Sequence, residues 1–539
     1  MGQILTASSL EKILPNAKKI PVEKKGKMAK NEVYSFQIAF KYDRFIRDFD
    51  LTINSKIKEF ITVRQVEYVP CTSPNTWQGD GYMIKDEPFL CPDVLKPFDK
   101  RGVFGRYNIW NVIWVTVKGN LPVGKHNIEL SMGYDEYKLS CNYTLEVLDY
   151  ELPKIDFTYT NWFHYDSIAN YYNLPVFSKK YNEIMYKYIE CAVNHGMNML
   201  LVPMFTPPLD TREGSERKTA QLVDICLTEN GYDFNFDRLI EFMKNVKKLG
   251  IEYFEMSHLF TQWGAKACPK IVAKKNGRRI KIFGWDDSAT GEKYTHFLSC
   301  FLPKLRERLI SEGLYDKCRF HISDEPNEAC LQEYKGAKDI FRKYMPDALI
   351  TDALSHYDFY KDGLVDSAIC ATDAIQVFLD NNVPNLWAYY CCAQSDKNLS
   401  NRFLAFPSLR TRVLGVQLYL NKIKGFLHWG YNFYNSILSD VAINPYFVTD
   451  AGGGFQSGDG FVVYPGENGP YDSIRHECFY DGFQDMYLLY ALEKKIGRES
   501  VEKILFDYGF EKGFYVYPHN EKVFLEMINK IKVMTSEAK

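Results

Sequence analysis

The first 150 residues carry short segments in which apolar and polar positions often alternate, the period-two pattern of half-buried β-strands. These segments are rich in β-branched and aromatic residues, and turn-prone pieces such as "GNLPVGK" separate them. The predicted strands cover residues 32–40, 58–69, 111–118, 126–132 and 137–150. Because no helical pattern lies between them, residues 1–152 are predicted to form an all-β sandwich domain that ends near Pro153.

From residue 153 the pattern changes to short apolar runs that alternate with amphipathic segments of helical period. Eight runs are predicted to be strands, at residues 157–165, 197–205, 253–260, 318–325, 348–354, 367–373, 385–391 and 425–433. Helices are predicted between most of them, at residues 179–196, 235–250, 294–313 and 327–344. Gly196, Gly250 and Gly313 stand where three of these helices are expected to end.

Eight strand–helix units in roughly 290 residues predict an α/β fold, a (β/α)₈ TIM-like barrel over residues 153–440 with some insertions. An open doubly wound sheet is the alternative, but it would not need eight units and usually carries a glycine-rich first turn, which this sequence lacks. Residues 441–539 hold a glycine-rich loop, "DAGGGFQSGDGFVVYPG", and then two helical stretches. The loop lacks the Gly-Lys-Ser/Thr of a phosphate loop, so we expect a lid or a structural connection, with the helices packed on the barrel.

Composition narrows the class of protein. Hydrophobic residues make up 46% and charged residues 25%, the profile of a soluble globular chain. The net charge is −2 and Lys and Arg do not gather on a periodic face, which argues against a nucleic-acid partner. No apolar run is long enough to span a membrane, and the first 20 residues lack the apolar core of a secretory signal. Thirteen cysteines without Cys-x-x-Cys spacing are typical of reduced thiols, so we expect a cytoplasmic protein, or an exported one if a leader has been trimmed.

The active site of a TIM-like barrel lies at the carboxyl ends of its strands. The predicted strands end in an acid pair, histidines and many aromatic residues: Trp162, His164, Ser257, His258, Trp263, Asp324, Glu325, His356, Asp373, Tyr389, Tyr390, Trp429, Tyr431 and Asn432. Aromatic faces stack on the C–H surfaces of sugars, and polar side chains bind their hydroxyl groups. We therefore expect a carbohydrate substrate, although a single histidine in such a place is more often a packed core residue.

The histidines also suggest a metal site. A zinc-binding barrel hydrolase usually shows His-x-His on its first strand, whereas this strand has His164 alone. The His-Glu-x-x-His motif is missing too, and the stretch that begins at His476 comes closest to it. We therefore expect neither a catalytic metal nor another cofactor.

Asp324 and Glu325 lie side by side at the end of a predicted strand, directly before Pro326. Cleavage of a glycosidic bond needs a protonated carboxyl group for the leaving oxygen and a second negative group for the charge at the anomeric carbon. A neighbouring carboxylate and aromatic walls raise the pKa of one acid, which then keeps its proton near neutral pH. The pair also fits a structural role, with Ser323 or Asp324 as the N-cap of a helix. The surrounding residues favour the catalytic interpretation.

Four stretches carry a resemblance to a known family: "FHISDEP", "HLFTQWGA", "GFLHWGYNFYN" and, in the tail, "GDGFVVYPGENGPYDSIRHECFYDGFQD". They resemble glycoside hydrolase family 123, and the tail also resembles the related domain of unknown function 4091. The resemblance covers most of the chain and implies a β-N-acetylgalactosaminidase that retains configuration by substrate assistance, through an oxazolinium intermediate. It further implies that Asp324 orients the 2-acetamido group and that Glu325 is the general acid and then the general base.

Two alternatives stay open. One is a glycosidase for another sugar that uses the same acid pair with a water or protein nucleophile, and the other is a non-catalytic carbohydrate-binding barrel. The residues expected to contact the sugar are Trp162, His164, His258, Trp263, Tyr389, Trp429, Tyr431 and Asn432.

Overall fold

The N-terminal region is rich in β-structure, as the alternating pattern predicts. The computed structural model describes residues 2–47, 50–75, 79–98, 104–133, 137–229 and 231–538. The N-terminal strands are β1 (Gln3–Ser8), β2 (Lys25–Ala29), β3 (Tyr34–Lys41), β4 (Ile46–Arg47), β5 (Asp50–Asn54), β6 (Ile61–Cys71), β7 (Phe89–Pro97), β8 (Phe104–Gly105), β9 (Asn111–Val117), β10 (Gly124–Gly133) and β11 (Leu139–Leu148). Five of them lie where strands are predicted from the sequence.

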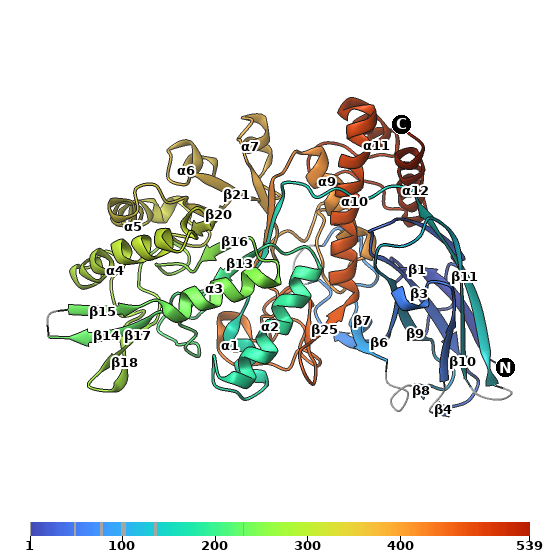
Figure 1. Cartoon of the computed structure of the whole chain (residues 1–539), viewed down its shortest axis with the longest axis horizontal. Helices are drawn as coiled ribbons and strands as arrows, with labels where there is room; N and C mark the ends of the chain where they lie inside the picture. The colour runs from blue at the N-terminus through green and yellow to red at the C-terminus, as the bar shows by residue number, and fades with distance from the viewer. Residues whose placement is uncertain are drawn as a thin grey trace.

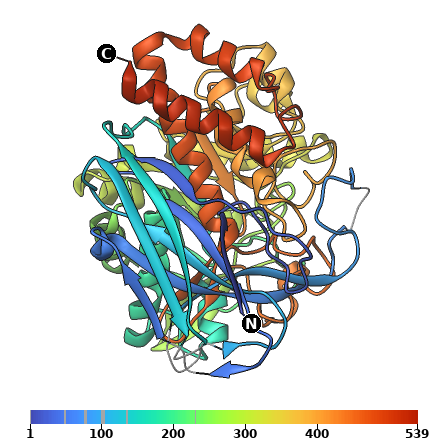
Figure 2. The same ribbon diagram turned by 90° about the vertical axis from the view of Figure 1, so that its right-hand side faces the viewer.

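Figure 2 shows the strands of this region, which form two larger sheets. Buried apolar residues of both sheets belong to one layer. One sheet contains β1, β3, β9, β6 and β7, and the other has the order β2-β11-β10-β5. Ile128, Leu130 and Met132, at every second position of β10, are buried in the layer, as the period of a half-buried strand requires. Tyr143 of β11 stacks on Phe36 of β3 with ring centroids 3.9 Å apart.

The tail extends the first of these sheets. Strands β24 (Tyr464–Pro465) and β25 (Pro470–Ser473) complete it in the order β1-β3-β9-β6-β7-β25-β24. In the antiparallel pair of β25 and β7, Asp472 lies opposite Leu95 and Ser473 opposite Val94. The two ends of the chain therefore build one sheet, and the domain boundaries near residues 153 and 441 stay predictions.

The middle of the chain forms a nearly closed barrel of eight parallel strands. These are β12 (Thr158–Asn161), β13 (Met199–Val202), β16 (Tyr253–Met256), β19 (Cys318–Phe320), β20 (Thr351–Leu354), β21 (Ser367–Ala371), β22 (Trp387–Tyr389) and β23 (Gly425–His428). Their order is β19-β16-β13-β12-β23-β22-β21-β20, and Phe320 and Ile350 form the parallel bridge that brings the two edges together. Each predicted apolar run contains one of these strands, so the TIM-like barrel is confirmed.

Helices surround the barrel strands. They are α1 (Tyr165–Tyr171), α2 (Lys179–Asn194), α3 (Asp237–Leu249), α4 (Glu292–Ser311), α5 (Leu331–Tyr344), α6 (Tyr357–Lys361), α7 (Gln376–Asp380), α8 (Ser408–Arg412) and α9 (Leu414–Leu420). The α3 helix buries Leu239, Ile240, Met243 and Val246, the spacing of one helix face. It ends at Gly250, whose φ of 118° is a conformation that favours glycine.

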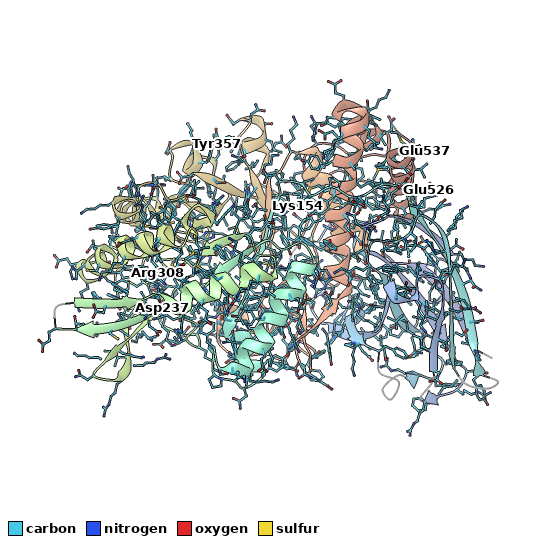
Figure 3. All side chains as sticks on the ribbon, in the orientation of Figure 1. Lys154, Asp237, Arg308, Tyr357, Glu526 and Glu537 are labelled. Atoms are coloured by element: carbon cyan, nitrogen blue, oxygen red, sulfur yellow. The ribbon has the colours of Figure 1, made fainter. Side chains whose placement is uncertain are left out.

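Ion pairs join neighbouring helices on the outer face of the barrel. Asp237 at the start of α3 lies 3.1 Å from Arg308 of α4, and Figure 3 shows the two side chains on adjacent helices. Both are partly exposed to solvent, and exposed pairs of this kind contribute about 0–1 kcal/mol. The apolar faces therefore hold these helices in place.

A second small sheet interrupts the barrel pattern. Its strands β14 (Asp224–Thr228), β15 (Gly231–Asn235), β17 (Ile271–Lys275) and β18 (Arg278–Phe283) have the order β15-β14-β17-β18 and project at the left of Figure 1. They belong to the segments that follow β13 and β16, so this insertion rises from the carboxyl side of the barrel.

The tail contains three helices rather than the two predicted stretches: α10 (Ile474–Ile496), α11 (Arg498–Asp507) and α12 (Glu521–Glu537). Gly497, with a φ of 79°, separates α10 from α11. The α10 helix is buried between the N-terminal sheets and the barrel (Figure 1). It crosses α9 closely, because a Cβ on Gly415 would lie 1.7 Å from the backbone oxygen of Gly482. Among the helices in the described ranges, none is both long and apolar enough to cross a membrane.

Candidate active site

A pocket of about 660 Å³ opens at the carboxyl ends of the barrel strands. Its wall includes residues that follow β12, β19 and β23, together with Tyr389 at the end of β22. This is the end of a parallel barrel where active sites lie. The lining residues are Trp162, Leu209, Asp210, Gln262, Trp263, Asp324, Glu325, Ala353, Tyr389, Cys391, Cys392, Leu427, Trp429 and Phe455.

Asp324 and Glu325 both line this pocket, because the backbone turns sharply after β19. Adjacent residues on a regular strand point to opposite faces. Here Glu325 has a φ of 43°, a left-handed conformation that costs a residue with a side chain on the order of 1–3 kcal/mol. The turn is held by Trp263, whose backbone N–H donates to the backbone oxygen of Asp324 at 2.9 Å. Such strain is common at functional sites.

The helix-cap interpretation of the acid pair is wrong. The next helical turn is a 3₁₀ turn at Glu328–Cys330, and its N-cap is Asn327. The Asn327 side chain accepts a hydrogen bond from the N–H of Ala329 at 3.0 Å. Ser323 instead donates its hydroxyl to the backbone oxygen of Thr261 at 2.8 Å. The two carboxyl groups are therefore not needed to begin a helix.

The pocket alters the acidity of both carboxyl groups. Burial raises the pKa of Asp324 well above its usual value, and the negative charge of Glu325 raises it further. Burial also raises the pKa of Glu325, while the Tyr389 hydroxyl, which donates to Oε1 of Glu325 at 2.8 Å, lowers it in part. Because like charges in one pocket oppose each other, the pair retains a proton to higher pH than two separate carboxyl groups would.

A buried network lies beneath the acid pair. His321 is 2.5 Å from Glu255 of β16 through Nε2 and 2.8 Å from Asp352 of β20 through Nδ1. Burial lowers the pKa of His321, but the two carboxylates raise it more, to about 10, so the ring carries a positive charge. Asp352 also accepts from the backbone N–H groups of Ile322 and Ser323 at 3.2 and 3.4 Å. The network therefore fixes the backbone that leads into Asp324.

Glu255 and Asp352 were missed in the sequence analysis, although both carry a visible signal. Each is a single carboxylate inside an apolar run that forms a buried barrel strand. A buried charge needs a partner, so such a residue predicts a buried hydrogen-bonding network. Their charged partner, His321, directly follows β19.

The structure brings four of the eight predicted sugar-contacting residues into the pocket wall: Trp162, Trp263, Tyr389 and Trp429. The others lie behind it. His258 is buried edge-on to Trp162, with ring centroids 5.2 Å apart. The other strand-end residues, Ser257, His356, Asp373 and Tyr390, also lie outside this wall.

Three of the residues behind the wall make hydrogen bonds to the start of α1, to the chain at Trp429 and to α2. His164 donates its Nε2–H to the backbone oxygen of Trp429 at 2.9 Å. Asn432 accepts from the N–H of His164 at 2.8 Å. Tyr431 donates its hydroxyl to the backbone oxygen of Tyr188 at 2.8 Å. These side chains position the pocket wall from behind.

Loops supply lining residues that were not predicted. Asp210 lies in the loop after β13, and its Oδ2 accepts from the N–H of Leu438 at 3.0 Å. Burial raises the pKa of Asp210 to about 6. Phe455, from the glycine-rich tail loop, packs edge-on against Trp429 with ring centroids 5.2 Å apart. The tail loop therefore forms part of the pocket wall.

Among the described residues, one group of side chains near the pocket has metal-binding atoms close together: His258, His321 and Asp352. Each ring nitrogen of His321 is hydrogen-bonded to a carboxylate, and all three side chains are buried and lie outside the lining of the pocket. This group fits a hydrogen-bonding network better than a metal site.

Comparisons with known proteins define the class. Residues 162–492 match the model of the glycoside hydrolase 123 catalytic domain, so the protein is a glycosidase and its substrate is a carbohydrate. The chain belongs to glycoside hydrolase family 123, which confirms the resemblance seen in its four sequence stretches. No curated protein matches the sequence.

Solved structures support the fold. A family 123 glycoside hydrolase from Clostridium perfringens, studied for glycolipid glycan hydrolysis, matches with a TM-score of 0.76 and 14% identity, over 99% of this chain and 98% of that one. An endo-β-1,4-mannanase from Thermotoga petrophila (TM-score 0.34, 11% identity, 62% of this chain and 77% of that one) is too distant to bear on function. The same holds for a putative β-galactosidase from Bacteroides fragilis (TM-score 0.32, 11% identity, 90% and 60%).

Proposed function

We propose that this glycosidase removes terminal β-linked N-acetylgalactosamine, with retention of configuration, by a substrate-assisted mechanism. The observation that carries the proposal is the placement of Asp324 and Glu325, adjacent in sequence, in one aromatic pocket. An enzyme that supplied its own nucleophile across the sugar ring would need two carboxyl groups on opposite sides of the scissile bond. With an internal nucleophile, both acids are needed on the same side.

In the first step, the carbonyl oxygen of the 2-acetamido group attacks the anomeric carbon while the bond to the leaving oxygen breaks. Glu325 donates its proton to that oxygen, and the sugar becomes an oxazolinium ion. The proposal places the one proton of the pair on Glu325, although burial alone would favour Asp324. Asp324, as a carboxylate, then accepts a hydrogen bond from the acetamido N–H and balances the positive charge. In the second step, Glu325 takes a proton from water, which attacks the anomeric carbon. The bond between that carbon and the acetamido oxygen breaks, the oxazolinium ring opens, and the sugar is released with β configuration.

The aromatic wall is proposed to bind the sugar. Trp162, Trp263, Tyr389 and Trp429 offer ring faces and edges to its C–H surfaces. We propose that His164, His258, Tyr431 and Asn432 act behind this wall as positioning residues. The N-terminal region has two sheets that share an apolar layer, and we propose that it is a β-sandwich domain that supports the barrel. Since the Clostridium perfringens relative was studied for glycolipid glycans, a glycoconjugate is the proposed substrate class.

A second mechanism is favoured by one observation. Asp210 is a third carboxyl group in the pocket, and its raised pKa of about 6 would suit a general base. A glycosidase for another sugar could use Asp210 to activate water or to attack the anomeric carbon. The configuration of the first product separates an inverting water mechanism from the proposed one.

Turnover of paired substrates tests the proposal. We expect hydrolysis of p-nitrophenyl β-N-acetylgalactosaminide and little or none of p-nitrophenyl β-galactoside, because the second lacks the internal nucleophile. NMR before mutarotation should show a β-configured first product, and a thiazoline analogue of the intermediate should inhibit tightly. Equal rates on both substrates, or an α-configured first product, would exclude substrate assistance.

Tyr389→Phe is expected to move the alkaline limb of the pH profile to higher pH. The Tyr389 hydroxyl donates to Glu325 and so lowers the pKa of that carboxyl group. Without the hydroxyl, the pKa of Glu325 rises and the group keeps its proton at higher pH. The profile of kcat/KM against pH measures this shift, since it reports the free enzyme. A shift to lower pH, or none, would mean that Glu325 is not the acid.

A further inference from the structure

Four side chains with metal-binding atoms converge at a second place, where α2, β25 and α10 meet. Cys191 and His195 belong to the last turn of α2, and Asp472 and His476 lie at the end of β25 and the start of α10. One ligand atom from each lies within 4.8 Å of the others. The end of α2 leads into the start of β13, so this cluster lies at the amino end of the barrel, opposite the sugar pocket.

The spacing of the four residues suits a single ion. Cys191 and His195 are four residues apart, and so are Asp472 and His476. Cys191 and His195 lie one turn apart at the end of α2, where residues at i and i+4 share a helix face. Asp472 and His476 come together, 2.8 Å apart, where β25 leads into α10. The same spacing in sequence joins ligands in structural zinc sites. The two pairs are far apart in sequence, which hides the site from a motif search.

The surroundings orient the ligands. Nδ1 of His195 bonds the backbone oxygen of Cys191 at 2.8 Å, which leaves Nε2 facing Asp472 at 2.9 Å. The His195 and His476 rings stack with centroids 3.9 Å apart. Asp472 also accepts from the N–H of Ser473 at 2.8 Å and lies 3.5 Å from Arg64 of β6. Ligating histidines usually have their other ring nitrogen fixed in this way.

The site has a path for entry. An open groove lies between β6, β7, α2 and the loop before β25. Cys191, His195 and Asp472 all line it, together with Arg64. An ion can therefore reach the three ligands from solvent, and His476 lies directly behind Asp472 at 2.8 Å.

We propose that Cys191, His195, Asp472 and His476 bind one Zn²⁺ ion as a four-coordinate structural site. One thiolate, two imidazole nitrogens and one carboxylate oxygen form the mixed ligand set that zinc accepts. The ion replaces the direct hydrogen bonds from His195 and His476 to Asp472, and the thiol of Cys191 releases its proton on binding. The bound ion joins the first long barrel helix, the tail helix α10 and, through β25, the N-terminal sheet.

Metal titration of the full-length protein tests the site. After removal of bound metal with a chelator, we expect one equivalent of Co²⁺ to bind with the charge-transfer absorption of a thiolate ligand, and Zn²⁺ to displace it. Zn²⁺ should also raise the Tm, because an ion that binds only the folded state stabilises it. Cys191→Ser should abolish the charge-transfer band and weaken binding about tenfold or more.

Two controls keep the result specific. Cys392→Ser removes a thiol of the sugar pocket and should leave the cobalt spectrum and the stoichiometry unchanged. Crystals of the wild-type protein grown with Zn²⁺ should show an anomalous peak among the four side chains, which needs no variant to fold. Failure of the wild-type protein to bind metal, a peak elsewhere, or a cobalt band that Cys392→Ser removes would each overturn the proposal.

Discussion

Replacing Glu325 by Gln is expected to lower kcat/KM for substrates with poor leaving groups by about 10²–10⁴, the usual contribution of general acid–base help. Glutamine keeps the size of the side chain and can still accept the Tyr389 hydroxyl, which lies 2.8 Å from Oε1. It has no acidic proton to donate to an alkyl or sugar leaving group. An activated aryl group needs little protonation, so its departure should be partly spared.

The leaving-group dependence is the measurement that matters. A series of aryl and alkyl β-N-acetylgalactosaminides should show a steeper dependence of rate on leaving-group pKa in the variant than in the wild-type protein. Glu328→Gln is a matched control, since Glu328 is exposed three residues later in the chain. It should leave every rate unchanged. If Glu325→Gln slowed all leaving groups equally, Glu325 would lose its role as the acid.

Asp324→Asn is expected to slow every substrate by the same factor, on the order of 10²–10³, as for the loss of one preorganised electrostatic contact in an active site. The amide oxygen of asparagine can still accept the acetamido N–H. It carries no charge, however, so the positive oxazolinium ion is no longer balanced. Binding of a thiazoline analogue should weaken in parallel, because the analogue resembles the intermediate.

Asp316→Asn is the matched control for this variant, because Asp316 is exposed just before β19. Its rates and thiazoline binding should equal those of the wild-type protein. A selective effect of Asp324→Asn on poor leaving groups would instead assign the proton donor to Asp324.

The same variant should be more stable than the wild-type protein at neutral pH. Burial and Glu325 raise the pKa of Asp324 in the folded state, so ionisation of Asp324 opposes folding. Below about pH 4 the group is protonated in both states and the difference disappears. As pH rises from there, the wild-type protein loses stability that Asp324→Asn keeps. Thermal unfolding at pH 4 and pH 7 measures this difference, and a lower Tm for the variant at pH 7 would contradict it.

The barrel could be predicted because each strand leaves a local signal. The runs at residues 197–205 and 367–373 each contain an unbroken apolar stretch, at 199–202 and 368–371, which is typical of parallel strands buried on both faces. The predicted strands in turn predict several pocket residues, because the carboxyl ends of all eight strands meet at one end of the barrel. Trp162, Asp324 and Trp429 are therefore placed together by the topology alone.

The positions of other residues relative to the pocket could not be predicted, because the chain is no longer extended beyond the carboxyl ends of the barrel strands. His164 is two residues after Trp162 and would share its face on a longer strand. However, β12 ends at Asn161 and α1 begins at Tyr165, so the alternation stops. Asp210 depends on the backbone of Leu438, more than 200 residues away. No local pattern encodes such a contact.

The short strands of the tail were missed for a similar reason. Strand β24 has two residues and contains Pro465, and β25 begins at Pro470. Proline is rare inside sheets and is tolerated at their edges or at the start of a strand. Strand β25 pairs with β7, which is distant in the sequence, and β24 pairs in turn with β25.

That pairing has a consequence for how the protein is made. Strand β7 leaves the ribosome with one edge bare, and the strand that covers this edge is encoded roughly 370 residues later. At about 5–20 residues per second, β7 waits on the order of 20–75 s for β25 to be synthesised. A bare edge can pair with the wrong chain during that time. The edge of β7 therefore stays open to such mispairing until translation is almost complete.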